Sequence, residues 1–109
     1  MRVYNMESAN GNKVANQFII ESEDESIITF QSYNSTIATI NHNDNTITIG
    51  RDWDYSMTTG KYRNLFFNEY FYPLKDKKAI DLLLETCDEN RQNKVSLFDG
   101  TIYTIKFEQ

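Results

Sequence analysis

The sequence predicts one α+β domain, in which a single twisted antiparallel sheet is packed by two helices on one face. Three observations predict this fold. Before Gly50, apolar residues alternate with polar ones in several short segments, as they do in half-buried strands. After Gly50 the apolar residues recur at helical spacing, and near the C-terminus two alternating segments flank Asp99-Gly100. A chain of 109 residues fits one domain, so we expect residues 1–109 to share one core.

Five strands are expected in the first half of the chain. Their ranges are 2–6, 14–21, 27–33, 36–40 and 47–49. In the third range Ile28, Phe30 and Ser32 share one face, because successive side chains of a strand point to opposite faces. The segment Asn43-Asp44-Asn45 favours a turn, since Asn and Asp tolerate the left-handed conformation.

The first helix is predicted from an aromatic face. Its apolar positions are spaced i, i+3, i+4 and i+8, at Tyr62, Leu65, Phe66 and Tyr70. Four polar side chains near the start of this helix are candidate N-caps, namely Asp54, Ser56, Thr58 and Thr59. Trp53 is expected to anchor the junction between the sheet and this helix, and Pro73 either ends the helix or starts the next one.

A second helix and a hairpin complete the predicted fold. The helix is predicted by an apolar stripe spaced i, i+3, i+4 and i+7, at Ile80, Leu83, Leu84 and Cys87. Residues 95–98 and 102–107 are expected to pair as a hairpin. The dipeptide Asp99-Gly100 between them suits a two-residue type I′ turn.

The composition and charge argue against several classes of protein. The net charge is −5 and the pI about 4.7, whereas direct binding of DNA or RNA requires a clustered basic face. No apolar run approaches the roughly 18 residues of a membrane span, and the first residues lack the apolar core of a signal peptide. A single cysteine excludes an internal disulfide. We therefore expect a cytoplasmic protein that binds neither nucleic acid nor a membrane.

The sequence offers no evident set of residues for catalysis or metal binding. His42 is the single histidine and lies in a polar turn, while Cys87 lies on an apolar stripe where a small buried side chain is expected. A zinc site requires about four ligands. Asp52 and Asp54 form a candidate carboxylate pair, but capping of the next helix by Asp54 is the favoured interpretation. We expect no enzyme activity and no cofactor.

Two groups of acidic residues are candidate partner-binding residues. The first group lies in the turn after the second strand and contains Glu21, Glu23, Asp24 and Glu25. The second group is spaced i, i+4, i+7 and i+8 on the second helix, at Asp81, Glu85, Asp88 and Glu89. Acids near a helix C-terminus oppose the helix dipole, so a partner would explain their presence. The alternative interpretations are a solvated turn for the first group and solubility for the second.

Aromatic residues crowd the middle of the chain. Eight of the fifteen aromatic residues lie between positions 53 and 72. One helix face cannot bury all of them, so we expect Phe67 or Phe71, together with Tyr72, to remain exposed. Exposed Phe and Tyr patches are typical of protein interfaces, and these three residues are therefore also candidate partner-binding residues.

Two segments of the chain resemble a known family. Residues 30–38 have the pattern F-x-S-Y-x-S-x-I-A, and residues 53–62 have the pattern W-D-Y-S-x-T-T-x-K-Y. Over about residues 28–67 the chain is similar to small proteins of unknown function that phages, prophages and plasmids of Gram-positive bacteria encode. This resemblance implies a mobile-element setting inside a bacterial host cell, and it implies no enzyme activity.

Small acidic phage proteins in such a setting are often anti-defence factors, and several anti-CRISPR proteins have this size and charge. An inhibitor of this kind acts as a DNA mimic on the basic nucleic-acid channel of an RNA-guided type II nuclease. The expected partner is therefore a protein, with a CRISPR-associated nuclease as the candidate. The alternative is a non-enzymatic accessory protein that binds another host or phage protein. The sequence indicates no oligomeric state.

Overall fold

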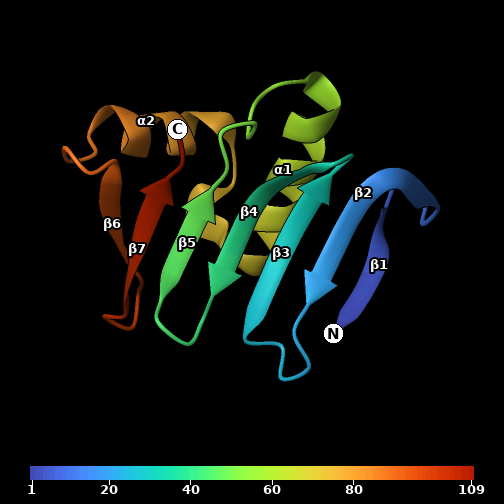
Figure 1. Ribbon diagram of the computed structural model, residues 1–109, viewed down its shortest axis with the longest axis horizontal. Coiled ribbons are helices and arrows are strands. Elements are labelled where there is room, and N and C mark those ends of the chain that lie inside the picture. The colour runs from blue at the N-terminus through green and yellow to red at the C-terminus, as the bar shows by residue number, and fades with distance from the viewer.

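Seven strands form one mixed sheet in the computed structural model, which describes residues 1–109 (Figure 1). The strands lie side by side in the order β1-β2-β3-β4-β5-β7-β6. Their bounds are Arg2–Glu7 (β1), Lys13–Glu21 (β2), Ile27–Ser32 (β3), Ser35–Asn41 (β4), Thr46–Ile49 (β5), Gln92–Ser96 (β6) and Ile102–Phe107 (β7). Each strand expected in the first half of the chain is present, with bounds within one residue of its expected range.

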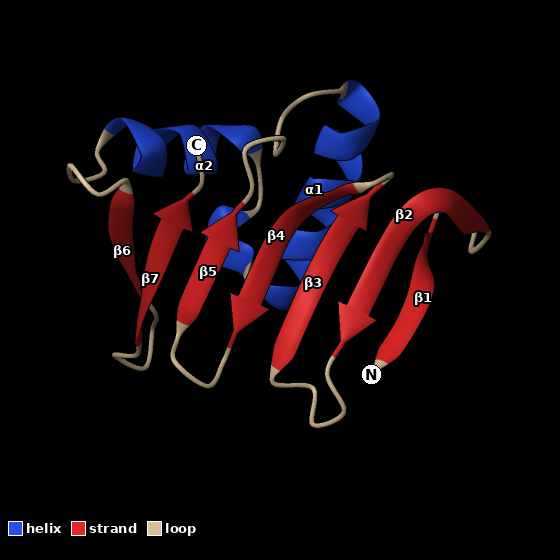
Figure 2. Cartoon of the chain, in the orientation of Figure 1, coloured by secondary structure: helices blue, strands red, loops and turns tan.

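Two α-helices and a short 3₁₀ helix cover one face of the sheet. They are α1 (Met57–Tyr70), η1 (Tyr72–Leu74) and α2 (Lys77–Glu85). Figure 2 shows them together behind the strands. The expectation of one sheet with two helices on one face is thus confirmed. None of the helices is long and apolar enough to cross a membrane.

The sheet is mixed, whereas a wholly antiparallel sheet was expected. The strands β5 and β7 pair in parallel, with Thr46 opposite Thr104 and Ile49 opposite Phe107. The reason is the path of the chain, which leaves β5, passes through both helices and returns to the outer edge as β6. The hairpin then turns β7 back between β6 and β5, so β7 is antiparallel to β6 and parallel to β5. A helical connection of this length permits parallel pairing.

The C-terminal hairpin has a longer turn than the expected two-residue one. The Leu97 amide donates to the Thr101 carbonyl (2.7 Å), and the Gly100 amide donates to the Leu97 carbonyl (3.0 Å). Gly100 has φ = +90°, which an L side chain rarely adopts. This is a three-residue loop in which a type I turn is followed by a left-handed residue. Phe98 therefore lies in the loop and not in the strand where it was expected.

The strands of the sheet supply most of the core. Ile28, Phe30 and Ser32 are all buried beneath the helices, as the alternation in β3 predicts. The Phe30 ring stacks on Phe66 of α1 with 5.7 Å between the ring centroids. The core continues through Ile40 and Ile47 in the neighbouring strands, which are fully buried. The opposite face is not covered by a helix, as is common for largely antiparallel sheets.

The buried face of α1 differs from the predicted one. It contains Thr59, Tyr62, Arg63, Phe66 and Phe67, whereas Leu65 is 44% exposed. This set follows the i, i+3, i+4, i+7 and i+8 spacing from Thr59. The face is rotated from the predicted one, because a pattern of apolar residues alone does not include the buried Thr59 and Arg63.

The aromatic residues at the end of α1 correct another expectation. Phe67 is fully buried and Phe71 is buried against Tyr103, with 5.0 Å between those ring centroids. Their expected exposure is wrong because the helical layer turns over the sheet at η1 and encloses both rings. Tyr72 is exposed, as expected.

The predicted apolar stripe of α2 is mostly confirmed. Ile80 is fully buried, and Leu83 and Leu84 pack partly buried against the core. The helix begins after Asp76, whose side chain accepts the Ala79 amide (2.9 Å). It ends at Glu85, so Cys87 packs against the core from beyond the helix.

Gly50 is predicted to tolerate no side chain, and Gly60 offers a matched comparison. A Cβ at Gly50 would collide with the Thr36 carbonyl oxygen, whereas a Cβ at Gly60 meets nothing closer than 3.6 Å. Gly50→Ala should lower the free energy of unfolding by about 1–3 kcal/mol through overpacking. Gly60→Ala, inside α1, should raise it by about 0.5–1 kcal/mol. Urea denaturation measures both changes, and equal effects of the two variants would contradict the close approach at Gly50.

Candidate functional site

Three turns lie together at one end of the sheet, and we call this end the turn edge (Figure 1, bottom of the view). The turns consist of residues 22–26, 42–45 and 97–101. Two of them are tied by the His42 amide, which donates to the Ser26 carbonyl (2.8 Å), and by the Asn43 amide side chain, which donates to the Ser26 hydroxyl (3.0 Å). His42 Nδ1 also lies 2.6 Å from the hydroxyl of Tyr103, at the start of β7. These contacts hold the edge as one surface.

The turn edge contains the entire net charge of the protein. Its three turns hold five carboxylates and no Lys or Arg, and these carboxylates are Glu23, Asp24, Glu25, Asp44 and Asp99. The eleven acids elsewhere in the chain are matched by the eleven Lys and Arg residues, so the rest of the chain is neutral. The amino group of Met1, 3.7 Å from Glu23, is the one cation paired with a carboxylate of this edge.

Hydrogen bonds within the turns orient two of the acids and keep them ionised. The Asp24 carboxylate accepts from the Ser26 hydroxyl (2.6 Å), the Ser22 hydroxyl (2.9 Å) and the Ser26 amide (3.1 Å). These bonds, that of the Ser26 side chain most of all, lower the pKa of Asp24 to about 2. The Thr101 amide lowers the pKa of Asp99 in the same way. The charge of the turn edge therefore persists well below neutral pH at these two positions.

Phe98 is fully exposed at this edge, immediately before Asp99. An isolated aromatic ring with no intramolecular cover is unusual, and aromatic rings are enriched at protein interfaces. The alternation of residues 95–98 predicts a strand that includes Phe98, and this prediction does not reveal the exposure of the ring. The signal in the sequence was the position of the ring directly before Asp-Gly, where a three-residue loop also fits.

The structure separates the first group of acids that the sequence predicted as a partner-binding surface. Glu23, Asp24 and Glu25 are exposed in the turn edge, as expected, but Glu21 is buried. Its expected exposure is wrong because Glu21 is the last residue of β2 and shares the helix-facing side with Ile19. There it accepts a hydrogen bond from the Tyr4 hydroxyl.

The second predicted group does not form a stripe on one helix. Asp81 and Glu85 belong to α2, whereas Asp88 and Glu89 follow its end at Glu85. Asp88 instead closes the turn before β6 by accepting the amides of Asn90 (2.8 Å) and Gln92 (3.0 Å). The helical spacing misplaced these two acids because the periodic pattern contains no signal for the C-terminal end of the helix.

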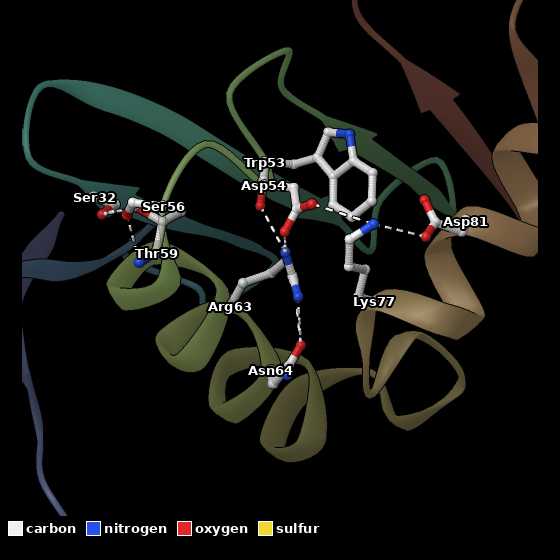
Figure 3. A network of polar contacts seen from close by, with 9 residues as sticks. All are labelled: Ser32, Trp53, Asp54, Ser56, Thr59, Arg63, Asn64, Lys77 and Asp81. Carbon is white, nitrogen blue, oxygen red and sulfur yellow. Dashed lines mark hydrogen bonds and ion pairs between the residues drawn. The ribbon is translucent and has the colours of Figure 1, made fainter.

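A buried arginine holds the junction between the sheet and α1 (Figure 3). Arg63, 2% exposed, donates to the Trp53 carbonyl (2.8 Å), to Asp54 (3.1 Å) and twice to the Asn64 side chain (3.2 and 2.9 Å). Its guanidinium carbon lies 5.2 Å from the Trp53 ring centroid, and Lys77 approaches the same ring at 5.6 Å. Trp53 thus anchors the junction mainly through its carbonyl and ring face.

The remaining polar contacts of this junction fix the start of α1. Ser56 is the N-cap, and its hydroxyl accepts the Thr59 amide at 3.1 Å. Thr59 in turn bonds to Ser32 of β3 at 2.9 Å. Asp54 pairs with Arg63 and Lys77 and does not cap the helix, while Asp52 accepts from Ser35 (3.0 Å). The two carboxylates therefore bind different partners. No group of three or more His, Cys, Asp or Glu side chains is arranged to hold a metal ion.

A second, partly buried network joins β1, β2 and α1. The Tyr4 hydroxyl donates to the Glu21 carboxylate and lies 3.0 Å from the Tyr70 hydroxyl. Arg2 approaches Glu21 at 3.5 Å. Burial, together with the bond to Glu21, strongly raises the pKa of Tyr4, and burial also raises the pKa of Tyr70. Both hydroxyls are therefore neutral hydrogen-bonding groups at physiological pH.

Arg63→Lys should lower the free energy of unfolding by about 2–4 kcal/mol. A lysine cannot reproduce the forked donation to Asn64, Asp54 and the Trp53 carbonyl, and buried acceptors left without a donor are costly. The measurement is urea denaturation followed by the fluorescence of Trp53, the single tryptophan. Arg51→Lys, at an exposed position, is the control and should stay within about 0.5 kcal/mol of wild type. A similarly small effect at position 63 would contradict the anchoring role.

The Tyr4 network predicts a loss of stability at high pH. Because the folded pKa of Tyr4 lies above its unfolded value of about 10, the folded state retains the proton where the unfolded chain has lost it. The stabilisation is therefore complete below pH 10 and decreases as the pH rises further. The difference in unfolding free energy between wild type and Tyr4→Phe should shrink from pH 8 to pH 11, as followed by circular dichroism in urea. A constant difference would contradict the network.

The chain was compared with protein families, with curated proteins and with solved structures. Neither a curated protein nor a solved structure matched it. A family model, described as a family of unknown function (DUF8033), matches residues 1–81. These residues include β1–β5, the whole of α1 with the Arg63 junction, and the first turn of α2. Since this match spans well over half of the chain, the protein belongs to the DUF8033 family.

Proposed function

We propose that this protein is a non-enzymatic anti-defence factor of a phage or another mobile element. In the host cytoplasm it binds an RNA-guided type II nuclease and blocks DNA binding or cleavage. The observation that supports this proposal is the confinement of the whole net charge of −5 to the turn edge. The choice of nuclease rests on the sequence resemblance described above and on the chemistry of the channel, which is lined by basic residues that accept a nucleic acid backbone.

The dimensions of the turn edge fit a basic groove. Four strand spacings separate the two outer turns, so the acidic surface extends over roughly 20 Å. Its carboxylates stand on turns of a rigid sheet, and the Ser and Thr bonds to Asp24 and Asp99 hold two of them in place. Pre-ordered charges lose little conformational entropy on binding. They also accelerate association with a partner of opposite charge.

Phe98 supplies an apolar contact within the acidic surface. Charge complementarity determines mainly the association rate, whereas buried aromatic rings contribute most to affinity. A fully exposed ring beside Asp99 therefore fits an apolar pocket that basic residues surround. Tyr72 is also exposed, beside Lys75, but it lies outside the turn edge and is the weaker candidate contact.

The alternative is a non-enzymatic accessory protein that binds a different host or phage protein. The same observation favours this function, because an acidic edge with an exposed ring fits any basic protein partner, whether or not it is a nuclease. The two functions use the same surface. They differ in whether purified nuclease is inhibited.

The decisive measurement is DNA cleavage by purified type II nuclease and guide RNA in the presence of excess protein. Wild type should inhibit, and inhibition should weaken at higher salt because salt screens exposed charges. The triple variant Glu23→Gln/Glu25→Gln/Asp44→Asn should inhibit about ten-fold less, through slower association. The control Asp81→Asn/Glu85→Gln/Glu89→Gln removes the same charge elsewhere and should inhibit as wild type does.

Two results would contradict these proposals in different ways. Undiminished cleavage with wild type across a panel of type II nucleases would exclude the nuclease as partner and leave the accessory function. Equal loss of inhibition in both triple variants would show that total charge matters and that the turn edge has no special role.

A further inference from the structure

A groove lies at the end of the sheet where the helical layer stops. In Figures 1 and 2 no helix lies behind β1, and α1 crosses behind β3 and β4. The groove between β1, β2 and α1 has a volume of about 720 Å³. This is within the range of small-molecule sites in proteins. Nothing in the proposed nuclease contact uses this groove, so the two inferences are independent.

The floor and one wall of the groove are apolar. Met6 and Ile19 form part of the lining from the sheet, and Leu65 forms part of it from α1. Leu65 is 44% exposed although its neighbours in the helix, Phe66 and Phe67, are fully buried. An exposed leucine beside an apolar floor favours a ligand with an apolar body.

The tyrosines at one end of the groove act as acceptors. The single proton of the Tyr4 hydroxyl is donated to Glu21, because an ionised carboxylate accepts and cannot donate. The Tyr70 hydroxyl, 3.0 Å away, therefore donates to the Tyr4 oxygen. The free lone pairs of Tyr70 are what this end of the groove offers to a ligand. The face of the Tyr4 ring already attracts a cation, since the Arg2 guanidinium lies 5.2 Å from its centroid.

The two asparagines of the lining use three of their four amide N–H donors within the protein. The Asn5 amide nitrogen donates to the Val14 carbonyl (2.8 Å). The Asn68 amide nitrogen donates to the carbonyls of Asn64 (2.7 Å) and Lys75 (3.0 Å). Asn68 is thus left with its carbonyl oxygen for a ligand, and Asn5 offers its carbonyl oxygen together with one remaining N–H.

The charges on the rim of the groove also favour a cationic ligand. Glu7, Glu69 and Lys13 line the groove, and none of them forms an ion pair. Two carboxylates against one ammonium leave the rim negative. Apart from Lys13, every polar group of the lining offers an acceptor to a ligand, and Asn5 also keeps one free N–H.

We propose that this groove binds a small amphipathic organic cation, namely a protonated amine or guanidinium attached to an aromatic or branched aliphatic body. The apolar body packs on Met6, Ile19 and Leu65. The cationic head donates hydrogen bonds to Glu69, to Glu7 and to the amide and hydroxyl oxygens between them.

The test is a titration with 2-phenylethylamine at pH 7, followed by the backbone amide signals in two-dimensional NMR spectra of the full chain. Two probes of the same shape serve as comparisons, the neutral 2-phenylethanol and the anionic 3-phenylpropionate. The amine should produce saturable shifts at the amides of β1, β2 and the second half of α1. Loss of charge-assisted hydrogen bonds should make the alcohol at least about five-fold weaker, and the acid should not bind.

Matched variants connect this binding to the groove. Leu65→Arg places a cation and a long side chain into the groove and should abolish the shifts, whereas Leu82→Arg, at a 60% exposed leucine of α2, should leave them unchanged. Glu69→Gln should weaken binding about three-fold, as loss of an exposed ion pair does, and the control Glu85→Gln should not.

Three results would overturn the proposal. They are shifts that do not saturate, shifts scattered over the surface, and equal affinities for the amine and the alcohol. Retained binding in Leu65→Arg, with a folded spectrum, would likewise show that the amine binds elsewhere.

Discussion

The buried guanidinium of Arg63 is the interaction on which the arrangement of this fold depends. A charged group in the interior is costly to desolvate, and it is stable there only when its donors are satisfied. Arg63 meets this condition with the Asn64 side chain, the Trp53 carbonyl and a partly exposed Asp54. These partners come from the loop that leaves the sheet and from α1 itself. The guanidinium thus fixes where the loop ends, and with it the position from which α1 crosses the sheet.

The position of α1 decides which surfaces remain open. Ser56 and Thr59 tie the first turn of α1 to Ser32 of β3, so the helix starts over the middle of the sheet. No helix then lies behind β1, where the groove opens. The helical layer also lies on one side only, so the turns at the ends of the strands remain accessible. Both candidate binding surfaces therefore remain open because of how the helical layer packs on the sheet.

Both proposed surfaces are expected to prefer cations, but for different physical reasons. The turn edge has excess charge on exposed turns, where the attraction is long-ranged and is screened by salt. The groove has only a small excess of charge, and its preference arises from hydrogen-bond donors that the protein has already used, as in Asn68, Tyr4 and Tyr70. Binding there depends on contact geometry and is less sensitive to salt. The first property suits a large basic partner, and the second suits a small ligand.

The sequence alone determined the local elements of this protein. Alternation placed Ile28, Phe30 and Ser32 on one face, and the spacing of Ile80, Leu83 and Leu84 identified α2, because these patterns depend only on the periods of strand and helix. It also determined the net charge and the acidic turn after β2.

Tertiary structure decided the rest. The parallel pairing of β5 with β7, the burial of Arg63 and Glu21, and the exposure of Phe98 all depend on which residues meet across long sequence separations. A local pattern contains no information about such partners. The same reason applies to the charge: residues 23–25, 44 and 99 form one acidic edge only because the sheet brings their turns to the same end, while the acids elsewhere are balanced by bases.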